Sequence, residues 1–163
     1  MNSPLFSWAS LLVTLAAALI AASVTLQAER RKRRTEADHQ WNKEKAANYA
    51  PLRRSARELA TIPVWPRDKN GETVETAPLV ASLHGIAAEI AFFGADSVNA
   101  AIERLLAAAT EFTETVRVIR STTEAGYHGD IDQRVVGSYR EAKQKLIAEI
   151  EAFTEAGRVD LLR

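Results

Sequence analysis

The sequence predicts an all-α protein with one N-terminal transmembrane helix followed by an antiparallel bundle of about four helices. Three observations lead to this fold class. A long uncharged apolar run opens the chain, and apolar residues recur at three- and four-residue spacing through most of the remainder. Alternation typical of a strand never extends beyond three or four residues. We therefore assign residues 1–34 to a membrane anchor and residues 35–163 to a helical bundle.

The apolar run Leu5–Ala28 contains no charged side chain. A helix of this length measures about 36 Å, compared with a hydrocarbon core of roughly 30 Å. Because a helix satisfies its own backbone polar groups, the segment is suited to crossing a bilayer once. A cleaved signal peptide is the alternative interpretation. Signal peptides have a basic start and a shorter apolar stretch, and this segment has neither.

A basic cluster follows the apolar run directly, and no Lys or Arg precedes it. Cytoplasmic flanks of membrane helices carry an excess of Lys and Arg, so the N-terminus is predicted outside and the bundle in the cytoplasm. This corresponds to a single-pass protein of a bacterial inner membrane. The cluster is also expected to bind anionic lipid headgroups, at about 1 kcal/mol per basic residue. Its members are Arg30, Arg31, Lys32, Arg33 and Arg34.

Small side chains recur every four residues within the predicted span. Helices in a bilayer associate by close packing, which small residues at this spacing permit. The stripe therefore predicts self-association or contact with a membrane helix of another protein, although an alanine-rich span can contain such spacing by chance. The stripe consists of Ser10, Thr14, Ala18 and Ala22.

Helical character is predicted to resume or continue from Thr35 to Ile62, where apolar residues form one stripe. Pro51 lies within this pattern and predicts a kink or break near Ala50, because proline removes a backbone hydrogen bond. Trp41 is expected to pack in the core, with a position against lipid headgroups, or docking on a partner, as the alternatives.

The segment Thr61–Thr76 is predicted to be a loop. Pro63 and Pro66 disfavour helical geometry in the residues before them, and a turn sequence follows at residues 68–71. Trp65, between the two prolines, is a candidate docking residue. The simpler interpretation is that its ring covers the end of the helical core.

The next two helices are predicted to form an antiparallel hairpin, since only Gly94 and a short link separate them. The second of them begins near Asp96 and carries a long apolar stripe: Val98, Ile102, Leu105, Ala109, Phe112, Val116 and Ile119. A last helix is predicted to start at Asp130 or Ile131 and to end at Gly157. Asp130 with Gln133 resembles a capping box, with Asp in place of Ser or Thr.

Composition argues against several function classes. Of 21 basic and 21 acidic side chains, residues 29–34 hold five and one, which leaves 16 and 20 for residues 35–163. A domain with a net charge of −4 is poorly suited to nucleic acid. The absence of cysteine excludes disulfides and thiolate chemistry.

No catalytic or metal-binding motif is apparent. A single Glu-x-x-His spacing occurs at residues 36–39, whereas paired metal sites in bundles need two such motifs and further carboxylates. His84 is expected to be a structural histidine near Glu58. The sequence therefore predicts no enzyme, no cofactor and no metal. A buried cluster of His84, Glu58 and Tyr139 would favour a ligand sensor or an enzyme instead.

The junction between the two helices of the predicted hairpin resembles a known arrangement. In Glu89–Leu106 one helix ends on a hydrophobic pair and glycine, and the next begins with a small polar cap. This organisation resembles that of small bacterial and prophage-encoded membrane proteins with one span and a cytoplasmic helical domain. The family supplies no catalytic residues that could be carried over to this chain. The resemblance implies a membrane-tethered interaction domain in phage–host conflict.

The sequence thus predicts a non-enzymatic accessory subunit or adaptor that contacts membrane lipid and another membrane protein. Two alternatives stay open. One is a prophage-encoded exclusion, defence or lysis protein, and the other is a sensor or enzyme with a pocket in the bundle.

Overall fold

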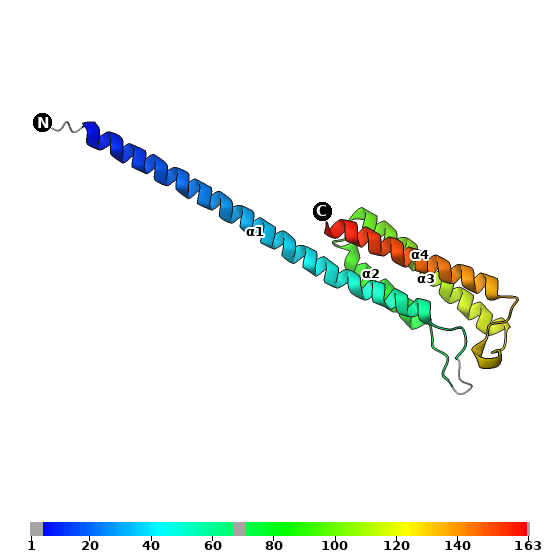
Figure 1. Ribbon diagram of the computed structural model, residues 1–163. Helices are drawn as coiled ribbons and strands as arrows, with labels where there is room; N and C mark the ends of the chain where they lie inside the picture. Colours follow the sequence, from blue (N-terminus) through cyan, green and yellow to red (C-terminus); the bar gives the residue numbers. More distant parts are fainter. Residues whose placement is uncertain (1–4, 67–70, 163) are drawn as a thin grey trace. The chain divides into compact units, whose positions relative to one another are not determined.

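The computed structural model describes residues 5–66 and 71–162, with side chains described from Thr25 onward except those of residues 30, 34, 37, 38 and 127. All secondary structure in these ranges is helical, which confirms the predicted all-α class (Figure 1). The elements are α1 (Leu5–Thr61), α2 (Ala77–Ala91), α3 (Asp96–Thr122), the short 3-10 helix η1 (Tyr127–Gly129) and α4 (Val136–Leu161).

The chain divides into two compact units, residues 1–43 and residues 44–163. The predicted division lay between residues 34 and 35. The second unit contains the last turns of α1 together with α2, α3, η1 and α4. Within the described part of the chain, no helix combines the length and the apolar character needed to cross a membrane. Most side chains of the predicted span Leu5–Ala28 lie outside the described residues.

The second unit is an antiparallel bundle, as predicted. Lys45 of α1 bonds to Asp160 near the end of α4, whereas Ile62 just after α1 bonds to Tyr139 near the start of α4. Helices α1 and α4 therefore run in opposite directions. Helices α2 and α3 are joined by the short link 92–95, and Figure 1 shows α3 and α4 side by side along their length.

The core is formed by one apolar stripe from each helix. Phe112 and Phe153 are its largest fully buried side chains. The stripe predicted for α3 is buried at every position, which confirms the hairpin's 4-3 pattern. Leu52, Leu59, Leu83, Ile90, Leu146 and Ile150 complete the centre.

The predicted break near Ala50 is wrong, because α1 continues through Pro51 without interruption. Pro51 and Ala47 are both exposed. The Ala47 carbonyl, which would have accepted the missing hydrogen bond, thus belongs to an exposed residue. A proline on the solvent side of a helix that packs elsewhere costs less than one facing the core.

Both predicted ends of the last helix are also wrong. Helix α4 begins at Val136, since Asp132 accepts a hydrogen bond from the Arg134 backbone N–H in a local turn at 2.9 Å. It continues past Gly157 to Leu161. A Cβ atom on Gly157 would lie 3.1 Å from Tyr49 Cδ2, so this glycine admits a neighbouring ring rather than ending the helix.

Candidate functional site

A groove of about 340 Å³ lies between α1 and α4 in the second unit. Its surface is mainly apolar, and its charged lining residues are both arginines, Arg53 from α1 and Arg158 from α4. The remaining lining residues are Ala46, Tyr49, Ala50, Phe153, Thr154, Gly157 and Leu161.

Helical periodicity explains why these residues gather. Positions 46, 49, 50 and 53 of α1 share one face, as do positions 153, 157 and 161 of α4. The Tyr49 ring lies between the helices, 5.9 Å from the Phe153 ring in an edge-on arrangement and 6.2 Å from the stacked Phe93 ring. Small residues beside one large ring leave space that no side chain of the bundle fills.

A buried polar cluster lies beside the groove. Lys45 Nζ and Tyr49 Oη donate hydrogen bonds to the same Asp160 oxygen, Oδ2, at 2.9 Å and 2.7 Å. The Asp160 side chain is 5% exposed and that of Lys45 is 12% exposed, so the ion pair is largely withdrawn from water. The three groups satisfy one another, as buried charges require.

The chemistry of this cluster is structural. Burial, together with the hydrogen bond to Asp160 and its negative charge, raises the pKa of Tyr49 well above its ordinary value. The phenol therefore stays protonated at neutral pH and keeps donating to the carboxylate. A proton donor held this firmly ties α1 to α4 and is a poor general acid or base.

The polar groups at the rim of the groove differ in their availability. The Arg158 guanidinium binds both Glu155 oxygens, at 2.9 Å and 2.7 Å. The Thr154 hydroxyl donates to the Ile150 carbonyl. Arg53 is exposed and forms no ion pair with any described residue. The groove thus presents one unpaired and one paired guanidinium, with no carboxylate in its lining.

Outside the groove, a single arginine of α3 anchors the loop that follows α1. Arg120 of α3 donates to the carbonyls of Val64, Val74 and Pro63, at 2.7, 2.9 and 3.3 Å. Backbone groups of a loop need partners when the loop packs on a core. The guanidinium supplies three donors from one side chain, which fixes the loop on the bundle.

The predicted docking residues have different positions. The Trp41 side chain is 48% exposed, so the expectation that it packs in the core is wrong. It belongs to the first compact unit, residues 1–43. Trp65 is half-buried and packs against that core, in agreement with the simpler interpretation of its ring.

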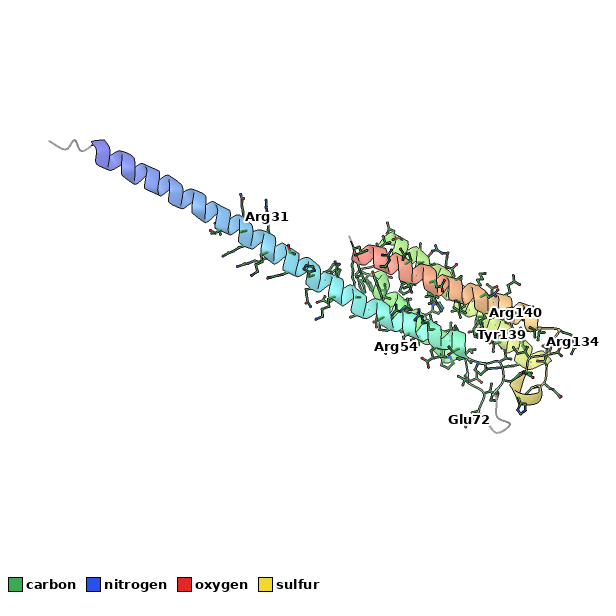
Figure 2. The ribbon with its side chains drawn as sticks, viewed as in Figure 1. Arg31, Arg54, Glu72, Arg134, Tyr139 and Arg140 are labelled. Atoms are coloured by element: carbon green, nitrogen blue, oxygen red, sulfur yellow. The ribbon has the colours of Figure 1, made fainter. Side chains whose placement is uncertain are left out.

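The predicted membrane residues are described only in part. Arg31, Lys32 and Arg33 are exposed, and Figure 2 shows Arg31 projecting from α1. Lys32 pairs with Glu36 across one turn at 3.9 Å. The side chains of Arg30 and Arg34, and those of Ser10, Thr14, Ala18 and Ala22, lie outside the described residues.

The hypothetical cluster that would have favoured an enzyme does not form. His84 and Glu58 are both exposed, while Tyr139 donates a hydrogen bond to the Ile62 carbonyl at 3.4 Å (Figure 2). Among the side chains that the structure describes, no group of three His, Asp or Glu residues is placed to hold a metal ion.

Sequence reasoning missed the groove and its polar cluster. One signal was available, since Gly157 is an isolated glycine inside a helical pattern and such a glycine often marks a close approach. Its partner Tyr49 and the bond to Asp160 span more than a hundred residues of sequence, so spacing along the chain does not reveal them.

No family model, curated protein or solved structure matches this chain.

Proposed function

We propose that this chain is a single-pass membrane protein of the bacterial inner membrane whose helical bundle is a non-enzymatic interaction module. The observation that carries the proposal is the uncharged run Leu5–Ala28 followed at once by five basic residues. Such a run is long enough to cross a bilayer, and the basic flank favours a cytoplasmic bundle.

The bundle supports the interaction role through the residues it holds. Its core is almost entirely aliphatic and aromatic, and its most buried charged group, Asp160, is satisfied by Lys45 and Tyr49. Catalytic sites require groups whose hydrogen-bonding capacity is open to a substrate. The groove between α1 and α4 offers an apolar recognition surface with basic residues at its rim.

The partners follow from the same features. The basic cluster Arg30–Arg34 contacts anionic lipid, and the small-residue stripe of the span packs against a second copy or a helix of another membrane protein. In this role the protein is an accessory subunit or adaptor at the inner face of the membrane.

Reporter fusions after Arg163 test the topology. We expect a fluorescent fusion to be bright, a phosphatase fusion to be inactive, and the chain to stay in the membrane pellet after alkaline carbonate extraction. Deleting residues 5–28 should move the protein to the supernatant. Phosphatase activity with a dark fluorescent fusion would place the bundle outside, and extraction of the intact chain by carbonate would exclude the anchor.

A further inference from the structure

We propose that the groove between α1 and α4 binds a single-chain amphiphile with a carboxylate head, such as a fatty acid of medium length. This goes beyond the proposed function and does not depend on the membrane anchor, because every lining residue belongs to the unit 44–163.

The size and lining of the groove specify the body of the ligand. Small-molecule sites have volumes of about 300–1,000 Å³ and mainly apolar walls, and a groove of about 340 Å³ is at the lower end of that range. This volume suits one hydrocarbon chain and is too small for the two chains of a phospholipid. The rings of Tyr49 and Phe153 and the side chain of Leu161 supply the apolar contact.

The charges at the rim specify the head group. Arg53 and Arg158 are the charged residues of the lining, and each guanidinium matches a carboxylate in two parallel hydrogen bonds. Asp160 accepts a hydrogen bond from the groove residue Tyr49 and is paired with Lys45, so its charge is largely balanced and does not repel an anion strongly. Arg158 must share its guanidinium with Glu155, whereas Arg53 has no such competitor among the described residues.

The Glu155 side chain therefore opposes binding. It holds the Arg158 guanidinium through two hydrogen bonds and places a negative charge beside the groove. Replacing Glu155 by Gln removes that charge and frees Arg158 for the ligand. If the groove binds a carboxylate, this substitution should raise the affinity for the probe. If the groove binds no ligand, the substitution should leave probe labelling unchanged.

The experiment uses the full chain in phosphatidylcholine nanodiscs and a dodecanoate with a terminal diazirine, followed by light and peptide mapping. We expect saturable labelling of peptides that contain Tyr49 or Phe153, competed by unlabelled dodecanoate and not by dodecylamine. Ala50→Leu, which fills the groove, should reduce this labelling at least five-fold. Ala47→Leu, on an exposed position of the same helix outside the groove, is its matched control and should not.

The charge variants complete the test. Arg53→Gln should weaken the apparent affinity about three-fold, and Glu155→Gln should strengthen it about two-fold. Arg54→Gln is the control, because Arg54 is exposed, lies outside the groove lining and is on the side of α1 away from α4 in Figure 2. Thermal melts of each variant show that the bundle is intact.

Three outcomes would overturn the proposal. Labelling of the groove peptides that is equal in Ala50→Leu and wild type would show that the probe does not occupy the groove. Equal competition by dodecylamine would show that the groove does not recognise the carboxylate head group. The third outcome combines two results: the probe labels residues 5–28 alone, and the chain forms a dimer that Ala50→Leu abolishes. Together they would show that a second copy of the chain, rather than an amphiphile, occupies the groove.

Discussion

Helix α4 meets its two neighbours in different ways, and the difference explains where the bundle can bind something. Helices α3 and α4 lie together over more of their length than any other pair of helices in the described part of the chain, and Ala101, Ala108 and Ala109 of α3 are fully buried. Along α1, the Tyr49 ring is inserted beside Gly157 and a groove remains. We call the α3–α4 interface the seam and the α1–α4 interface the edge. Small residues on a helix face favour close packing, as at the seam, whereas one large ring with small neighbours leaves a groove, as at the edge.

The two interfaces also differ in where their charges lie. The α3–α4 seam carries ion pairs on its exposed margins, between Arg104 and Glu149 and between Lys145 and Glu111. Surface pairs of this kind contribute little to stability. The α1–α4 edge instead withdraws the Lys45–Asp160 pair from water. Removing one partner of a buried pair is costly, so a single polar contact matters more at the open edge.

The largest effect is expected from breaking the buried pair. Lys45→Met should lower the free energy of unfolding by about 3 kcal/mol, because the buried Asp160 carboxylate loses the cation that pairs with it. The double variant Lys45→Met with Asp160→Leu should recover most of that loss. Denaturant unfolding of both variants measures it. A double variant as unstable as the single one would show that the pair itself, rather than the orphaned charge, provides the stability.

A smaller effect is expected from adding volume to the two interfaces. Ala109→Leu inserts three carbon atoms at a fully buried position and should cost about 1–3 kcal/mol. Ala50→Leu adds the same atoms at the exposed groove, where the change should stay within about 0.5 kcal/mol. Thermal melts of the two variants compare the interfaces directly. Equal destabilisation would mean that the edge is packed as tightly as the seam.

The smallest effect is expected from deprotonating the Tyr49 phenol at the α1–α4 interface at alkaline pH. The pKa of Tyr49 is raised in the folded protein, so its contribution to stability is complete below its ordinary pKa of about 10 and is lost as the pH rises above that value. Unfolding curves measured above pH 10 should therefore lose stability more steeply in wild type than in Tyr49→Phe. If the free energy of unfolding fell equally with pH in the two proteins, the Tyr49 phenol would not contribute to the pH dependence of stability.

The sequence alone determined the class of fold and the buried faces of the helices. Apolar residues at three- and four-residue spacing placed the stripe of α3 correctly at every position, because such a stripe has to be buried against another helix whatever the partner is. The pairing of α2 with α3 followed from the short link between them, which favours an antiparallel hairpin.

Tertiary packing decided what the local signals could not. Pro51 is accommodated because its side of α1 faces water, and Gly157 stays helical because Tyr49 occupies the space where a side chain would be. Trp41 is exposed, although its spacing continued the apolar stripe of the residues after it. The groove, its rim arginines Arg53 and Arg158, and the Lys45–Tyr49–Asp160 cluster all join the C-terminal part of α1 to the last turns of α4. Only folding brings these distant residues together.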